Sequence, residues 1–162
     1  MNVMSATGQT SDDSRRYAQD YYAWAREQAC ALRERHIELI DFEHLAEEVE
    51  DLAKRERREL RSRLMRLLAH LLKCQFQVAR RSRSWDATLF VNRTEIETLL
   101  EDSPTLRREL PELIDRAYAS AQRVACKEMR MEREEAARVF PATCPWSVEQ
   151  ILAVEFYPDQ PK

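Results

Sequence analysis

Glu56, Arg63 and His70 are the side chains of this sequence whose spacing is most suggestive of chemistry. They follow one another at seven-residue steps, so at about 100° per residue they border the same leucine-rich helix face. A histidine held by a carboxylate can act as a general acid or base. Asn92 and Tyr118 are the polar residues expected to face such a site from other helices. The simpler interpretation is a structural border of paired charges, because partly buried charges are normally paired.

Asp41, His44 and Glu48 offer a second chemistry, metal binding. Carboxylate-x-x-His units on facing helices hold di-iron centres in helical bundles. The sequence contains only one such unit, whereas a di-iron centre needs two units and bridging carboxylates. We therefore expect no metal or other cofactor, with Asp41 capping a helix and His44 in solvent.

Charge is segregated along the middle of the chain. Residues 38–51 contain seven acidic residues and no Lys or Arg, and residues 54–83 contain eleven basic residues against two acidic ones. A solvated helix whose charges match its own dipole is the simplest explanation. An antiparallel second copy would instead place acidic halves opposite basic halves, which predicts a homodimer. The candidate partner-binding residues are Glu47, Glu48, Asp51, Arg80, Arg81, Arg83 and Trp85.

Nucleic acid is the alternative partner for the basic segment 54–83. Arg80, Arg81 and Arg83 could contact phosphates, and Trp85 could stack on a base. The pI of about 5.7 opposes this interpretation, because nucleic-acid-binding domains are usually basic overall.

Glycine is almost absent, since Gly8 is the only one in 162 residues. Phosphate-binding loops, dinucleotide-binding turns and tight hairpins all need glycine, so these classes are excluded and helices are favoured. The sequence shows no secretory signal and no apolar run long enough for a membrane span. The four cysteines form no C-x-x-C pair. We expect a cytoplasmic protein with free thiols and no membrane partner.

These residues must be positioned by helices, which the apolar periodicity and capping signals delimit. We expect an all-α bundle of four main helices and a short C-terminal helix, with a disordered leader over 1–10, one domain over 11–157 and a tail over 158–162. The predicted helices run from near Ser11 to Arg35, over 41–79, from Trp85 to Asp102, from Ser103-Pro104 onward with a kink or restart at Pro111, and from Ser147, which forms a capping box with Gln150.

The second predicted helix is unusually long. At 1.5 Å per residue it spans about 55–60 Å, which is too long for a compact domain unless it bends or serves a second subunit. Its apolar face comprises Phe42, Leu45, Ala46, Val49, Leu52, Ala53, Leu60, Leu64, Leu67, Leu71 and Cys74.

Several short strings in this sequence carry a family resemblance. They are residues 47–52 (EEVEDL) with Glu56, residues 70–73 (HLLK), residues 82–85 (SRSW), residues 100–104 (LEDSP), and residues 144–146 (CPW) with Glu149 and Gln150. Together they resemble the bacterial family catalogued as domain of unknown function 29, over roughly residues 17–157. Cys74 departs from the family pattern, in which Trp is expected. The resemblance implies a small helical bundle and no established activity. We expect an interaction or scaffold protein rather than an enzyme.

Overall fold

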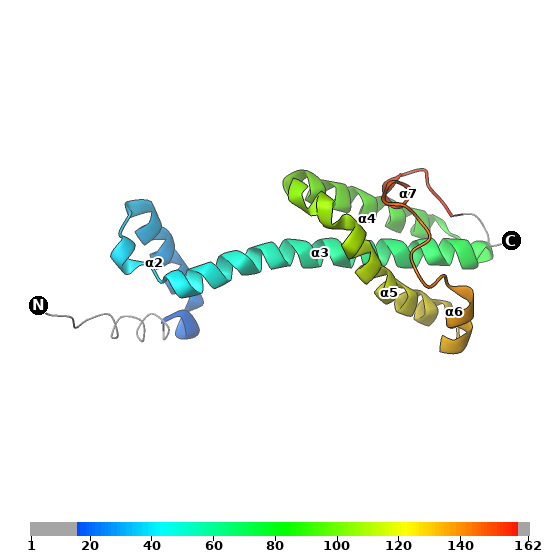
Figure 1. Ribbon diagram of the computed structural model, residues 1–162, viewed down its shortest axis with the longest axis horizontal. Helices are drawn as coiled ribbons and strands as arrows, with labels where there is room; N and C mark the ends of the chain where they lie inside the picture. The colour runs from blue at the N-terminus through cyan, green and yellow to red at the C-terminus, as the bar shows by residue number, and fades with distance from the viewer. Residues whose placement is uncertain (1–15, 159–162) are drawn as a thin grey trace, which may run out of the picture. The chain divides into compact units, whose positions relative to one another are not determined.

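The computed structural model describes residues 16–158, and every regular element in this range is helical (Figure 1). This confirms the predicted all-α class. Residues 16–19 form a helical turn, and the following elements are α2 (Tyr21–Glu34), η1 (Ile37–Leu39), α3 (Phe42–Phe76), η2 (Val78–Arg80), α4 (Arg83–Asp102), η3 (Pro104–Glu109), α5 (Leu110–Met129), α6 (Arg133–Val139) and α7 (Val148–Leu152).

Capping side chains account for where several of these helices begin. The Asp41 carboxylate accepts a hydrogen bond from the His44 backbone N–H at 3.2 Å and so caps α3. Ser147 and Gln150 form the predicted capping box of α7. The single helix expected up to Arg35 is wrong in its described part. It is interrupted at Asp20, whose side chain accepts a hydrogen bond from Ala23 N–H at 3.0 Å and starts α2.

The predicted restart at Pro111 is confirmed. A 3₁₀-helix occupies Pro104–Glu109, and α5 begins at Leu110 with the proline in its first turn, where a missing N–H costs nothing. One helix escaped prediction: α6, Arg133–Val139, has a single buried residue, Ala136. A helix with one buried residue has no repeating apolar pattern in its sequence from which it could be predicted.

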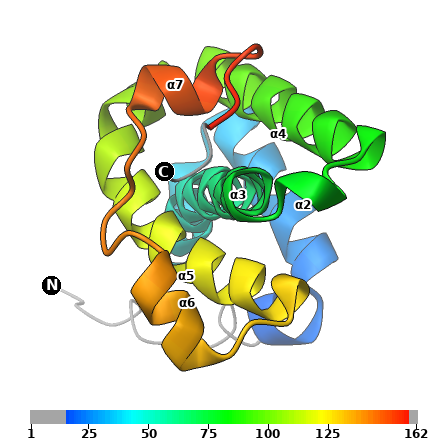
Figure 2. The ribbon, with the colours of Figure 1, turned by 90° about the vertical axis from the view of Figure 1, so that its right-hand side faces the viewer.

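The chain divides into two compact units, Met1–Arg55 and Glu56–Lys162. In the described part of the first unit, burial is limited to Trp24, Gln28, Ala31 and Asp41. The second unit has a continuous core in which leucines of α3 from Leu60 onward pack with residues of α4, α5 and α7. Figure 2 shows the end of α3 surrounded by α4, α5, α6 and α7.

Two arginines adopt the left-handed conformation that glycine usually supplies at helix C-termini. Arg35 follows α2 with φ of 61°, and Arg130 follows α5 with φ of 56°. The backbone N–H groups of Arg130 and Met131 bond carbonyls in the last turn of α5, including that of Cys126. The geometry is that of a glycine-terminated helix, built here on a residue whose Cβ disfavours it.

Replacing Arg130 with glycine should therefore stabilise the protein. The Arg130 side chain is exposed, and removing Cβ relieves the left-handed strain, so the free energy of unfolding should rise by about 0.5–1 kcal/mol. Denaturant unfolding of Arg130→Gly and Arg130→Ala measures this. Arg130→Ala keeps Cβ and serves as the control. Equal stability of the two variants would contradict the assignment of strain at this position.

Candidate functional site

A buried carboxylate organises the N-terminal unit. Asp41 Oδ2 accepts hydrogen bonds from Trp24 Nε1 at 3.3 Å and from the His44 ring Nδ1 at 2.7 Å. The Asp41 backbone N–H donates to Gln28 Oε1 at 2.8 Å, and Gln28 Nε2 donates to the Leu39 carbonyl at 3.3 Å. These bonds tie α2 to the start of α3. The expectation that His44 is solvated is wrong, since its side chain is only 18% exposed and is bonded to Asp41.

Two tyrosines hold Glu48 beside this network. Tyr17 Oη donates to Glu48 Oε1 at 2.7 Å, and Tyr21 Oη donates to Oε2 at 2.8 Å. The Tyr17 ring also stacks on His44, with ring centres 4.2 Å apart. The hydrogen bond to Glu48 raises the pKa of Tyr17 to about 12, and the hydrogen bonds from Tyr17 and Tyr21 lower the pKa of Glu48.

The three residues of the metal alternative therefore have other partners. Asp41 and His44 bond each other, and Glu48 accepts from two phenols. Within residues 16–158, no group of three or more His, Cys, Asp or Glu side chains is arranged to hold a metal ion. We interpret the network as structural, because its hydrogen bonds connect α2 with the segment that leads into α3.

The phenol of Tyr17 provides a direct test of this network. Because the pKa of Tyr17 is higher in the folded protein than in the unfolded chain, the protonated phenol contributes to stability. This contribution is complete below the unfolded pKa of about 10 and is lost as pH rises through about 12. In Glu48→Gln, the Tyr17 pKa should fall toward 10, because the carboxylate that stabilises the protonated phenol is gone. Ultraviolet absorbance titration measures this. The curve of Tyr17→Phe is subtracted from that of the parent, and the curve of Tyr17→Phe/Glu48→Gln from that of Glu48→Gln, so that only the Tyr17 phenol remains in each difference. An unchanged Tyr17 titration in Glu48→Gln would show that Glu48 is not its partner.

Exposed apolar side chains gather on this N-terminal unit. Among the described residues, 13 large apolar side chains are exposed, and eight of them lie before residue 56. These eight are Tyr21, Tyr22, Leu32, Ile37, Leu39, Phe42, Val49 and Leu52. The predicted apolar face of α3 is buried from Leu60 onward, whereas Phe42, Val49 and Leu52 are 60%, 60% and 58% exposed.

The uncovered residues of α3 form one continuous band, which we call the α3 stripe. At about 100° per residue, Phe42, Ala46, Val49, Leu52 and Ala53 fall within a sector about 120° wide, and all five are exposed. One edge of the stripe is mainly acidic, and Lys54 on that edge pairs with Glu50 at 3.4 Å. Glu43 and Glu50 lie at its edge, Glu47 lies one step further round, and all three are exposed.

The hydrogen bonds of the four catalytic candidates do not join them to one another. The His70 ring donates from Nδ1 to the Arg66 carbonyl at 3.0 Å, and burial lowers the His70 pKa. Glu56 is exposed and lies 14 residues before His70 on the same helix, about 21 Å away along its axis. Asn92 donates to the Thr88 carbonyl at 2.8 Å, and Tyr118 donates to the Pro141 carbonyl at 3.1 Å. Among the described residues, His70 makes no hydrogen bond to any of the other three.

Two of the partner-binding candidates near the end of α3, Trp85 and Arg81, already contact side chains of their own chain. The Lys73 ammonium lies 4.5 Å from the centre of the Trp85 ring, and the His70 ring meets that ring edge-on at 6.5 Å. Arg81 pairs with Asp86 at 3.1 Å and lies over the Tyr157 ring.

Arg80 and Arg83 are exposed. In the acidic half, Glu47 is exposed and Asp51 pairs with Lys54 at 3.0 Å.

Arg93 is a structural residue that the sequence analysis missed. Its side chain is 3% exposed and donates to the carbonyls of Ile151, Val154 and Phe156 at 3.0, 2.9 and 2.8 Å. It follows Leu89 by one helical turn and precedes Ile96, so it stands on the buried face of α4. The sequence did carry a signal for this role, because Arg93 is a charged residue at a position of the helix pattern that is otherwise apolar.

The chain is thus an all-helical protein with a filled C-terminal core and an N-terminal unit that leaves apolar surface uncovered. It belongs to the family described as domain of unknown function DUF29, which matches residues 16–157. The resemblance seen in the sequence is confirmed. Comparison with curated proteins and with solved structures gave no match. No helix within residues 16–158 is long and apolar enough to cross a membrane.

Proposed function

We propose that this chain is a protein-interaction module that binds a basic amphipathic helix of another protein along the α3 stripe. The observation that supports this is the uncovered apolar band on α3, with exposed glutamates along one of its edges. An amphipathic helix that lays its apolar face on such a band is a recurrent mode of recognition.

Burial of the stripe would drive the association. Phe42, Val49 and Leu52 are each about 60% exposed, and full burial of such side chains contributes about 1.5–3 kcal/mol each. A helix that covers them therefore gains roughly 3–5 kcal/mol before the cost of association is subtracted. Tyr22 and Leu39 of the same unit are also exposed, at 71% and 54%.

Charge complementarity favours a basic partner over a second copy of the same stripe. Residues 38–55 contain seven acidic residues against Lys54 and Arg55, so two copies joined at this surface would repel. The antiparallel homodimer predicted from the sequence would instead use the basic half of α3. There Arg57 and Arg63 already bond acidic side chains of their own chain, Arg57 at 2.6 and 3.1 Å and Arg63 at 2.6 Å. Homodimerisation is therefore the alternative to binding of a basic helix, and sedimentation of the chain alone, described below, distinguishes the two.

The other roles considered from the sequence have less support. A base could not stack on the Trp85 face that Lys73 covers, which weakens the nucleic-acid alternative for residues 54–83. A catalytic role for His70 remains a prediction without a partner residue. We place the interaction in the cytoplasm because the four cysteines, Cys30, Cys74, Cys126 and Cys144, are free, as expected in a reducing compartment.

Binding of designed peptides tests the proposal. The first probe is a fluorescent leucine/lysine amphipathic helix of about four turns, and the second replaces every lysine with glutamate. The basic peptide should bind with an affinity that falls as salt is added, and the acidic peptide should not bind. Val49→Ser should weaken binding roughly tenfold, because it places a hydroxyl in the centre of the stripe.

Val91→Ser is the matched control, since Val91 is also an exposed helical valine but lies on α4. It should bind the basic peptide like the parent protein. Equal losses in both variants, or equal binding of both peptides, would contradict the proposal. Sedimentation of the chain alone addresses the alternative: a dimer at micromolar concentration that Val49→Ser leaves intact but high salt dissociates would favour the charge-paired homodimer.

A further inference from the structure

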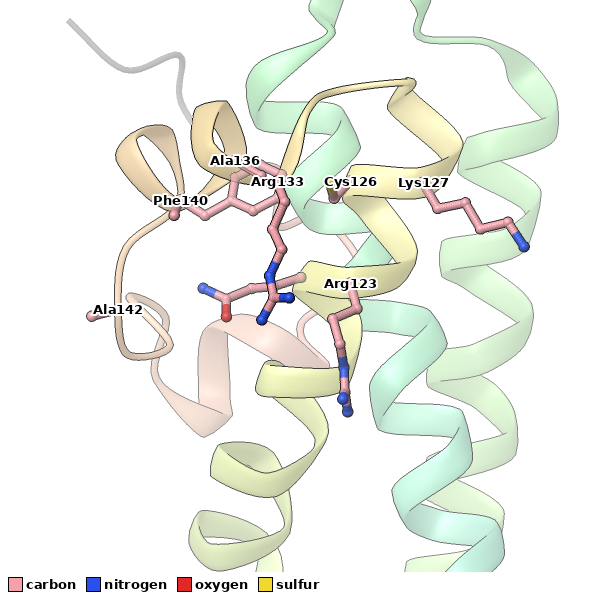
Figure 3. Close-up of a pocket in the computed structure, with 9 residues that line it drawn as sticks. Arg123, Cys126, Lys127, Arg133, Ala136, Phe140 and Ala142 are labelled. Atoms are coloured by element: carbon pink, nitrogen blue, oxygen red, sulfur yellow. The ribbon is translucent and has the colours of Figure 1, made fainter.

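An open cleft in the C-terminal unit shares no residue with the α3 stripe. It encloses about 650 Å³ and is formed by the second half of α5, by α6 and by the segment that follows α6 (Figure 3). A volume of this size is typical of sites for small molecules. The cleft takes no part in the interaction proposed above.

The charges that line the cleft all have one sign. Arg123, Lys127 and Arg133 line it, and no Asp or Glu does, although the chain contains 29 acidic residues against 26 basic ones. Arg123 donates to Ser120 Oγ at 3.1 Å. Within residues 16–158 none of the three cations forms an ion pair with a carboxylate. Figure 3 shows Arg133 and Arg123 extending in the same direction from α6 and α5, while Lys127 points away from them.

The remaining lining is mainly apolar and well supported. Ala136 and Phe140 are each 6% exposed and form the inner wall together with Cys126. The Phe140 ring packs on Phe76, with ring centres 5.3 Å apart.

The chain after Phe140 is also fixed in place. The Pro141 carbonyl accepts from Gln122 Nε2 at 2.7 Å and from Tyr118 Oη at 3.1 Å. This wall therefore exists before any ligand binds, which lowers the cost of binding.

We propose that this cleft binds a small anionic amphiphile. Its carboxylate or phosphate head would lie on Arg123 and Arg133, and its apolar tail would lie against Ala136 and Phe140. Two guanidinium groups that extend the same way suit either anion, since each can donate paired hydrogen bonds. The apolar wall excludes a bare inorganic anion as the best ligand, because that ion would leave the wall unused.

Calorimetric titration with three eight-carbon probes tests the proposal and separates the two head groups. The probes are octanoate, octyl phosphate and uncharged 1-octanol. At least one of the anions should bind at least roughly tenfold more tightly than octanol, and its affinity should fall with added salt. The tighter anion identifies the preferred head group.

Variants locate the binding. Arg123→Gln and Arg133→Gln should each weaken anion binding about tenfold, because each removes a charge-assisted hydrogen bond. Arg138→Gln is the matched control: Arg138 is an exposed arginine on the same helix, α6, and does not line the cleft. It should bind as the parent does. Amide NMR shifts on addition of the tighter anion should centre on residues 122–142.

Three results would overturn the proposal. The first is octanol binding as tightly as both anions, and the second is equal affinity in Arg123→Gln, Arg133→Gln and Arg138→Gln. The third is a set of NMR shifts that centres on residues outside the cleft. All three variants change exposed side chains, so folding is expected to be intact, and the amide spectrum of each variant checks this directly.

Discussion

Arg93→Met should lower the free energy of unfolding by about 3 kcal/mol. The substitution preserves most of the side-chain volume but removes the donors that bond the carbonyls of Ile151, Val154 and Phe156. A hydrogen bond from a charged group contributes about 1.5–3 kcal/mol, and a buried carbonyl left without a donor costs more than one that water can reach. Part of this loss is offset because a buried charge is no longer desolvated.

Two further variants make this prediction specific. Arg93→Lys keeps the charge but lacks the planar fork that reaches three acceptors, so it should be about as unstable as Arg93→Met. Arg108→Met is the control, since Arg108 is an exposed arginine of η3, and it should stay within about 0.5 kcal/mol of the parent. Denaturant unfolding measures all three, and limited proteolysis should show early cleavage after residue 147 in the Arg93 variants. If Arg93→Met is as stable as Arg108→Met, the three bonds do not hold the C-terminal segment.

Glu128→Gln should destabilise the protein more than Lys73→Met, even though both break the same ion pair. Lys73 Nζ and Glu128 Oε2 are 2.6 Å apart, and their side chains are 10% and 44% exposed. Losing Glu128 leaves a buried ammonium without a counter-charge, at a cost of about 2–3 kcal/mol. Losing Lys73 leaves a carboxylate that water can solvate, so Lys73→Met should change stability by about 1 kcal/mol or less.

The double variant tests the origin of this asymmetry. If the buried ammonium is the cause, Lys73→Met/Glu128→Gln should recover most of the stability lost in Glu128→Gln alone. Denaturant unfolding of the four proteins forms a complete cycle. Additive losses, or a greater loss in Lys73→Met, would show that the pair or the contact of Lys73 with Trp85 stabilises the fold in its own right.

Most helix boundaries could be predicted because they depend on local chemistry. Asp41, Ser147 and Pro111 act on backbone groups within one turn, and all three predictions are confirmed. The interruption at Asp20 was not predicted, because the apolar spacing of Tyr17, Tyr21 and Trp24 continues across it. That spacing does not show where hydrogen bonding is interrupted.

The candidate site could be predicted only in part, because whether an apolar face is covered depends on contacts with residues that are distant in the sequence. The sequence showed that the same face of α3 is apolar from Phe42 to Cys74. It could not show that the covering helices reach only the part from Leu60 onward. The 14-residue spacing of Glu56 and His70 placed them on one border, but it also separates them by about four helical turns, so the spacing alone gave no support for contact between them.

The central position of the α3 leucines also governs how the chain must be made. Leu60 is fully buried, and Ile151, which helps to close the same core, follows it by 91 residues. At 5–20 residues per second, translation takes about 5–20 s to bridge that interval. During this time the leucine-rich segment can be covered only by the core residues of α4 and α5 that have already been made, and the core stays incomplete. Until the last core residues have been made, a newly synthesised chain therefore exposes leucine surface that the finished fold buries.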